Sequence, residues 1–213
     1  MSFKFRDHIK NNMFITTIFS EDKKIIYMKP GRTASTSIYR GPLQSLNVRE
    51  ANLPYWKYNG TCDWLENITD EEIFNDYFIF TIVRNPFERL ISAWYAFVVK
   101  NRAISDFGEF IGGRGSPYLL DENGKFNNEH WLPLHYYVEF DENNSFIDFV
   151  GKYENLNDDW KFIAEKIGAS TVLPYDTNSI GKHRYYREYY TDELVEIVSD
   201  FYKRDLELFN YEF

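Results

Sequence analysis

The chain has 213 residues, of which 44% are hydrophobic, and this is enough to bury one well-formed core. Its net charge of −9 argues against a general nucleic-acid binder, which needs an electropositive surface, and against a heavily sulfated polymer as a partner. Cys62 is the only cysteine, which excludes an intramolecular disulfide and a cysteine-based metal site.

The N-terminal residues contain no apolar segment of signal-peptide length, and no run elsewhere approaches the length of a membrane span. We therefore expect a soluble protein of a reducing cytoplasm without a membrane span. There is no internal repeat, low-complexity tract or linker-like stretch, so residues 1–213 are expected to form a single domain.

The first informative segment is a short apolar run, residues 24–28, followed by a turn rich in hydroxyls and cations. The run predicts a buried strand. Gly31 permits a tight turn, in which backbone N–H groups and the hydroxyls of Thr33, Ser35, Thr36 and Ser37 face an anion. The alternative is a Ser/Thr-rich helix cap on a solvated turn. A Walker A loop is excluded because the Gly-Lys-Ser/Thr ending is missing. The following helix should be short, since Gly41-Pro42 interrupts it.

The second informative segment is the apolar run 77–83, which predicts another buried strand and ends at Arg84. A helix should begin directly after it, because Asn85 can cap, Pro86 suits the first helical position and Glu88 completes a capping-box pattern. Its apolar stripe consists of Leu90, Ile91, Trp94, Phe97 and Val98.

Two further helices are predicted near the C-terminus. Asn157 is expected to cap the first, which should stop at Gly168 and bury Trp160, Ile163, Ala164 and Ile167. Thr191 should open the second, with Leu194, Ile197, Val198, Phe201 and Leu208 facing inward. Residues 101–128 and 170–190 follow neither period and are expected to be loops.

A strand, a helix and a second strand in this order predict an α/β domain whose central sheet is mainly parallel and flanked by helices. Each of the two motifs provides a helix N-terminus at which backbone N–H groups and the helix dipole favour an anion. Two such sites in one domain suggest a ligand with two separated anionic groups, as in a nucleotide that carries 5′ and 3′ phosphates.

These motifs resemble those of carbohydrate sulfotransferases that use 3′-phosphoadenosine 5′-phosphosulfate (PAPS). The runs at 33–37 and 83–92 are similar to the 5′-phosphosulfate and 3′-phosphate segments of heparan sulfate 2-O-sulfotransferases. His130-Trp131-Leu132-Pro133, the run 149–156 and the ending 205–211 resemble the chondroitin 4-O-sulfotransferase branch. The resemblance implies a P-loop-like sulfotransferase fold, PAPS as sulfuryl donor with 3′,5′-ADP as product, and no metal.

The resemblance also assigns site residues. Thr33, Ala34, Ser35, Thr36 and Ser37 would hold the 5′-phosphosulfate. Arg84 and Ser92 would hold the 3′-phosphate, and the bidentate guanidinium of Arg84 suits a dianion. The alternative for Arg84 is an ion pair with Glu88, and for Arg89 a structural role is as reasonable as a ligand contact.

The catalytic cation is either Arg32 or Lys29. The family usually has Pro-Lys directly before this run, whereas here Pro30-Gly31-Arg32 intervenes. Register against the Thr-Ala-Ser-Thr-Ser block favours Arg32, which would also contact the donor and stabilise charge on the departing oxygen.

The general base is less clearly indicated, because residues 31–83 lack the histidine found between the two motifs in related heparan sulfotransferases. Asp63 or Glu66 could replace it, and His130 and His135 are the other candidates. We favour His130, since imidazole can accept a proton near neutral pH without a large pKa perturbation.

The leading hypothesis is in-line transfer of a sulfuryl group from PAPS to a hydroxyl of a carbohydrate or glycoconjugate acceptor, with no nucleic-acid partner. The alternatives are a non-catalytic glycan- or nucleotide-binding module and a P-loop phosphotransferase.

The chain is rich in aromatic residues, with 19 Phe, 17 Tyr and 5 Trp. Most of these rings should fill the core, and some tyrosines and tryptophans could line a groove in which they stack on sugar C–H faces.

Overall fold

The computed structural model describes residues 15–52, 69–96, 106–112, 118–141, 144–174 and 185–213. The chain separates into two compact units. The first comprises residues 1–30, 34–83 and 136–174, and the second comprises residues 31–33, 84–135 and 175–213. Among the described residues, no helix combines the length and the apolar character needed to cross a membrane.

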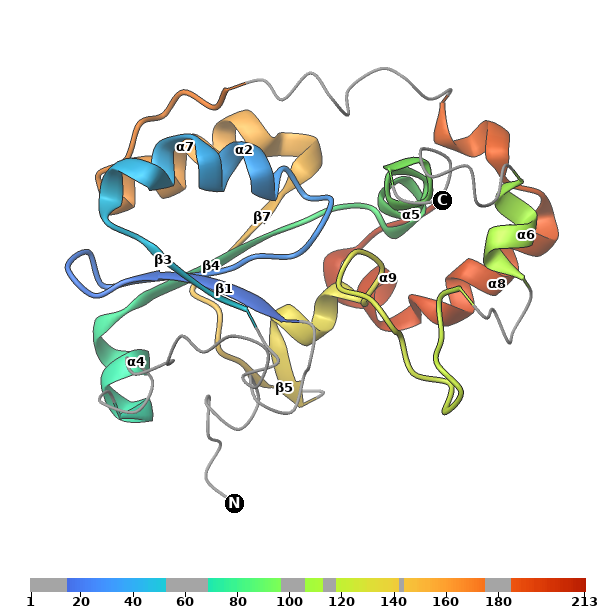
Figure 1. The fold of residues 1–213 in the computed structure, drawn as a ribbon, viewed down its shortest axis with the longest axis horizontal. Coiled ribbons are helices and arrows are strands. Elements are labelled where there is room, and N and C mark those ends of the chain that lie inside the picture. Colours follow the sequence, from blue (N-terminus) through green and yellow to red (C-terminus); the bar gives the residue numbers. More distant parts are fainter. Residues whose placement is uncertain (1–14, 53–68, 97–105, 113–117, 142–143, 175–184) are drawn as a thin grey trace. The chain divides into compact units, whose positions relative to one another are not determined.

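The first unit is built on a five-stranded sheet (Figure 1). Its strands, in the spatial order β3-β1-β2-β4-β7, are β3 (Arg49–Asn52), β1 (Thr16–Ser20), β2 (Ile25–Met28), β4 (Phe78–Val83) and β7 (Phe149–Lys152). Strands β2, β4 and β7 run parallel, whereas β1 pairs antiparallel with both β2 and β3. The predicted α/β class and both predicted strands are confirmed, and the antiparallel pair β1 and β3 makes the sheet mixed.

Both faces of the central strands are buried, which explains why they read as continuous apolar runs in the sequence. Alternate residues of a strand point to opposite faces. Tyr27 and Phe80 are fully buried on one face, where their rings stack at a centroid distance of 4.9 Å. Ile26 and Ile79 are equally inaccessible to solvent on the opposite face.

Helices α2 (Ser35–Arg40) and α7 (Leu156–Ile167) lie on the same face of this sheet in Figure 1. Buried residues of both helices share one apolar cluster with β2 and β4, and Trp160 is its largest member. The short α2 ends at Gly41, as predicted from Gly41-Pro42. Helix α7 ends at Gly168 as predicted, but its N-cap is Asn155 and not Asn157, which lies inside the first turn.

Smaller elements complete the first unit. They are α4 (Asp70–Asp76), the two-stranded sheet of β5 (Glu139–Asp141) and β6 (Asn144–Ser145), and the 3-10 turns η1 (Pro42–Leu46) and η5 (Tyr153–Asn155). Helix α4 begins with a reciprocal capping box between Thr69 and Glu72.

The described elements of the second unit are all helical. Those that lie wholly within it are α5 (Pro86–Trp94), α6 (Phe107–Ile111), η6 (Tyr186–Tyr189), α8 (Asp192–Phe201) and α9 (Lys203–Phe209). The 3-10 turn η4 (Leu134–Tyr137) begins in the second unit and ends in the first. Thr191 caps α8 by accepting from the Leu194 N–H, as predicted. The single helix expected there breaks at Tyr202, so Phe209, and not the half-buried Leu208, becomes a buried residue of α9.

Helix α5 begins where the sequence predicts. The Asn85 side chain accepts from the Phe87 N–H at 3.0 Å, and Pro86 occupies the first turn. Glu88, expected to complete a capping box, instead forms an ion pair with Arg84. The predicted stripe residues Leu90, Ile91 and Trp94 are buried, while Phe97 and Val98 lie outside the described residues.

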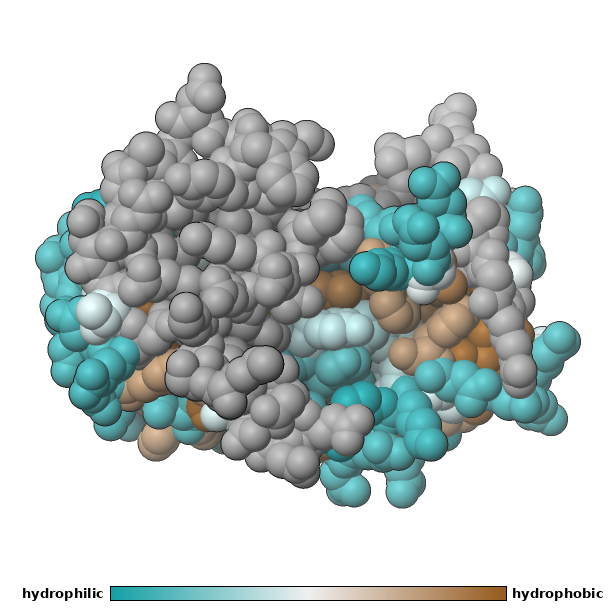
Figure 2. Space-filling model, turned by 90° about the horizontal axis from the view of Figure 1, so that it is seen from below, coloured by the Kyte–Doolittle hydropathy of each residue, from teal (hydrophilic) through white to brown (hydrophobic). Residues whose placement is uncertain are grey.

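Helix α6 was not predicted, because residues 101–128 were expected to be a loop. It has five residues, is capped by Asp106 and ends at Gly112, so it is too short to show a helical period in the sequence. Phe107, Phe110 and Ile111 anchor it in the aromatic core of the second unit. Figure 2 shows some hydrophobic surface among hydrophilic residues, which is usual for a folded protein.

Candidate anion-binding site

The centre of the candidate site is a buried arginine of the second unit. Arg89 on α5 is 1% exposed. Its Nε donates to the Gly31 carbonyl at 2.9 Å, Nη1 to the Leu132 carbonyl at 2.8 Å and Nη2 to the Glu129 carbonyl at 3.1 Å. The guanidinium therefore binds two chain segments that are distant in the sequence to α5. The sequence left open whether Arg89 has a structural role or contacts a ligand, and the structure shows the structural role.

The two sequence motifs meet at Arg32 and Ser92, both of which belong to the second unit. Arg32 donates to the Ser92 hydroxyl from Nε at 3.1 Å and from Nη2 at 2.9 Å. Arg32 itself has a φ of 68°, a left-handed conformation that is uncommon for a residue with a side chain. Strained backbone of this kind is concentrated at functional sites, where the surrounding structure holds it.

Arg84 contacts both motifs as well. Its Nη1 donates to the Arg32 carbonyl at 3.2 Å, and its Nη2 lies 2.8 Å from a carboxylate oxygen of Glu88. The ion pair with Glu88 that was considered as an alternative is therefore present. It does not exclude a ligand role, because a guanidinium has five N–H donors in a planar fork.

The hydroxyl-rich run does not cap the helix that follows it. Ala34 occupies the N-cap position of α2, with a φ of 63° and no side-chain cap. The alternative of a Ser/Thr helix cap is therefore wrong. Thr33 and Ser35 are buried. Residues 34–37 belong to the first unit, and their contact with a phosphosulfate stays a prediction.

Lys29, the other candidate cation, has a different environment in the first unit. Its ammonium forms an ion pair with Glu50 on β3 and lies 5.4 Å from the centre of the Tyr39 ring. This arrangement occupies Lys29 with partners of its own unit, whereas Arg32 contacts a residue of the second motif.

His130 packs directly against the first motif. A Cβ atom added to Gly31 would lie 2.3 Å from His130 Nδ1, which is far closer than atoms can approach. Gly31 is therefore required here for space. The left-handed conformations of this turn occur at Arg32 and Ala34 and not at Gly31, whose role in the turn was predicted from its conformational freedom. The side chain of His130 is 23% exposed, and its Nε2 lies 3.6 Å from a Glu129 carboxylate oxygen.

His135 is held by a buried carboxylate. Its Nδ1 lies 2.8 Å from an oxygen of Asp205, which is fully buried and also accepts the backbone N–H groups of Leu134 and His135.

Tyr202 donates to the Trp131 carbonyl at 2.6 Å. Burial raises the pKa of Tyr202 well above its usual value, although nearby Arg89 partly opposes the shift, so the phenol remains a donor.

The remaining candidate bases, Asp63 and Glu66, lie in residues 53–68, outside the described residues. Conversely, sequence reasoning missed the supporting roles of Tyr202 and Asp205. The sequence did contain an indication that Arg89 is buried. It lies in a helix in which most of the neighbouring residues are apolar. A charged residue in such a helix is buried only when it is paired.

Comparison with known proteins identifies the family. A sequence profile described as the sulfotransferase family matches residues 16–212, nearly the whole chain. The chain belongs to the sulfotransferase family. The suspected relationship is thereby confirmed at the family level, while the likeness to particular heparan or chondroitin branches stays a prediction.

Similar curated proteins are carbohydrate sulfotransferases. Carbohydrate sulfotransferase 10 of Danio rerio is 27% identical over 91% of this chain and 66% of its own length. Carbohydrate sulfotransferase 14 of Homo sapiens is 30% identical over 62% of this chain and 39% of its own length. The chain thus spans 39% and 66% of the length of these two relatives. No solved structure matches it.

The donors of the second unit suit a phosphate or phosphosulfate. The Arg32 guanidinium donates to the Ser92 hydroxyl, and the Arg84 guanidinium donates to the backbone carbonyl of Arg32. Arginine forks match the geometry of phosphate oxygens, and charge-assisted bonds of this kind are strong. The donor set therefore fits the nucleotide that the sequence predicts.

Replacing Arg89 by Met should destabilise the protein by at least about 3 kcal/mol, because two buried carbonyl groups and one partly buried carbonyl group lose their donor. Chemical denaturation followed by circular dichroism measures the change. The exposed Arg49→Met is the matched control, since its ion pair with Glu21 is on the surface and contributes little. Similar stabilities of the two variants would contradict the role assigned to Arg89.

Proposed function

We propose that this sulfotransferase transfers a sulfuryl group from PAPS to a hydroxyl of a carbohydrate acceptor by in-line displacement. The observation that carries the proposal is the contact between the motifs, in which Arg32 bonds to Ser92 and Arg84 bonds to Arg32. Bound PAPS supplies an activated sulfuryl group. The acceptor oxygen forms a bond to sulfur while the sulfur–oxygen bond to the 5′-phosphate breaks and 3′,5′-ADP leaves.

In this proposal Arg84 and Ser92 bind the 3′-phosphate, and Arg32 stabilises the negative charge on the leaving oxygen. Preorganised donors aimed at developing charge are usually the largest electrostatic contribution to catalysis. The protein has a net charge of −9, so a local group of guanidiniums is needed to attract a nucleotide that carries several negative charges. Residues 33–37 as the 5′-phosphosulfate loop are part of the same proposal.

His130 is the proposed base that takes the proton of the acceptor hydroxyl. Its ring packs on Gly31, the residue that precedes Arg32 in the first motif. His135 is the weaker candidate, because the bond between its Nδ1 and the buried Asp205 fixes the segment that follows Trp131. Asp63 remains an alternative from the sequence.

Two further expectations stay predictions. Among the described residues, no group of three or more His, Cys, Asp or Glu side chains is arranged to hold a metal ion. The expectations of metal-independent transfer and of a cytoplasmic location both rest on the sequence alone.

A phosphotransferase is disfavoured by membership of the sulfotransferase family. Turnover of labelled PAPS with a panel of glycans distinguishes an enzyme from a non-catalytic binding module.

Recognition of the 3′-phosphate can be measured directly. The protein should bind 3′,5′-ADP much more tightly than 5′-AMP in titration calorimetry. Arg84→Ala should remove most of this preference, at a cost of about 2–3 kcal/mol, because a charged hydrogen-bond donor is lost. Arg49→Ala, in the first unit, is the control and should bind like the wild type. Equal affinity of the wild type for both nucleotides would refute the PAPS proposal.

The choice between Arg32 and Lys29 predicts different kinetics. Arg32→Ala should lower kcat by about 10²-fold or more and change 3′,5′-ADP affinity much less, because the target charge is largest in the transition state. Lys29→Ala should have a mild effect, since Lys29 pairs with Glu50. Steady-state kinetics with PAPS decide between them, and a crippled Lys29→Ala beside an active Arg32→Ala would reverse the assignment.

The assignment of the base predicts a pH profile. Activity should rise with pH across the range in which histidines lose their proton, because only neutral imidazole accepts one. His130→Ala should abolish transfer and leave 3′,5′-ADP binding nearly unchanged, while Asp63→Asn retains substantial activity. If Asp63→Asn is inactive and His130→Ala is active, the base is the carboxylate.

A further inference from the structure

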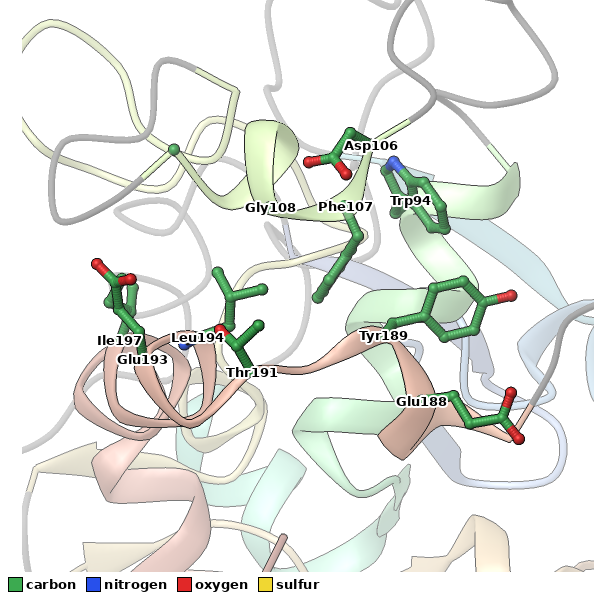
Figure 3. Close-up of a pocket in the computed structure, with 11 residues that line it drawn as sticks. Trp94, Asp106, Phe107, Gly108, Glu188, Tyr189, Thr191, Glu193, Leu194 and Ile197 are labelled. Carbon is green, nitrogen blue, oxygen red and sulfur yellow. Dashed lines mark hydrogen bonds between the residues drawn. The ribbon is translucent and has the colours of Figure 1, made fainter.

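A pocket of about 580 Å³ lies within the second unit, away from the residues assigned to the nucleotide. This volume is typical of pockets that hold small molecules, about 300–1,000 Å³. Figure 3 shows its lining, which comes from the end of α5, the beginning of α6, η6 and the first turns of α8. Trp94 and Ser92 are two positions apart on α5 and therefore point in directions about 200° apart.

Three aromatic rings form one part of the lining. Trp94 contacts Phe107 at a centroid distance of 5.4 Å and Tyr189 at 5.6 Å, both edge to face. Phe107 and Tyr189 are 6.5 Å apart in the same arrangement. Trp94 and Phe107 are buried, so the rings hold one another in place and present a rigid apolar surface.

The pocket also contains a buried donor. Trp94 is 5% exposed, yet within the described part of the chain its indole N–H has no hydrogen-bond acceptor. In Figure 3 the ring nitrogen is drawn at the Asp106 side of the pocket lining. A buried indole N–H normally finds a partner, so this donor is available to a ligand.

The charged groups of the lining are all acidic. Carboxylates of Asp106, Glu188 and Glu193 contribute to the lining, and no Lys, Arg or His is among the described residues that form it. One oxygen of Asp106 caps α6 by accepting the Glu109 N–H at 2.8 Å. The pocket therefore combines an apolar aromatic surface, one buried donor and several acceptors.

This combination selects a class of ligand. An anion is repelled by the carboxylates, and a protonated amine or quaternary ammonium ion offers no acceptor to the indole N–H. An apolar ligand leaves the buried indole N–H of Trp94 without a partner, which is costly. A hydroxyl both donates and accepts, and a sugar ring carries several hydroxyls beside an apolar C–H face that can lie on an aromatic ring.

We infer that this pocket binds a neutral sugar unit, with Trp94 as donor, Glu193 as acceptor and the aromatic rings as the stacking surface. The site is separate from the candidate nucleotide site and would hold a glycan at a point other than the transferred hydroxyl. Its existence does not depend on sulfuryl transfer.

The test uses the whole chain and a panel of neutral methyl glycosides, with binding measured by saturation-transfer NMR and titration calorimetry. We expect at least one glycoside to bind equally well with and without excess 3′,5′-ADP. Trp94→Phe, which keeps an aromatic ring but removes the N–H, should weaken its binding roughly two- to tenfold. Glu193→Gln should also weaken it, whereas the matched control Glu196→Gln, exposed on the same helix, should not.

If Trp94→Phe does not fold, Leu194→Arg provides a second test, because a long side chain from this half-buried lining residue blocks the pocket and should abolish glycoside binding. The inference is overturned if no neutral glycoside binds, if 3′,5′-ADP displaces the glycoside, or if the variants leave its binding unchanged. Tetramethylammonium or glucuronate binding with the same dependence on Trp94 and Glu193 would likewise overturn it. If the wild type does not bind 3′,5′-ADP, this result contradicts the proposed function but not the glycoside site.

Discussion

The arrangement of the candidate site depends on one buried cation. The Arg89 guanidinium is shielded from water, and three backbone carbonyls, from Gly31, Glu129 and Leu132, accept its N–H groups. These carbonyls belong to segments 40 to 58 residues away in the sequence. A charge taken out of water must keep such partners, so the loop geometry at all three places is coupled to the position of α5.

The segment 129–135 is held from a second direction. Tyr202, between α8 and α9, donates to the Trp131 carbonyl, and Asp205 on α9 accepts from two consecutive N–H groups at Leu134 and His135. Helix α5 and the C-terminal helices therefore fix the same segment, on which His130 lies. Because the backbone of segment 129–135 is hydrogen-bonded at several points, the position of His130 is well defined, as a catalytic side chain requires.

Local signals allowed much of this architecture to be predicted. Two buried strands, the caps Asn85 and Thr191 and the stop at Gly168 all act within a few residues, so the sequence displays them directly. Features that depend on distant residues were not predictable, such as the hydrogen bonds from Arg89 to the carbonyl groups of Gly31, Glu129 and Leu132. The short α6 could not be predicted, because five residues are too few to show a helical period. The meeting of Arg32 with Ser92, 60 residues apart, follows from tertiary folding alone.

The close packing of His130 on Gly31 has an evolutionary consequence. A side chain at position 31 has no room while a histidine occupies position 130. A side chain at position 31 is then tolerated only after His130 has been replaced, so the order of mutations matters. Among descendants of a common ancestor, these two positions should vary as a pair, and a lineage that acquires a side chain at position 31 must first have replaced the imidazole.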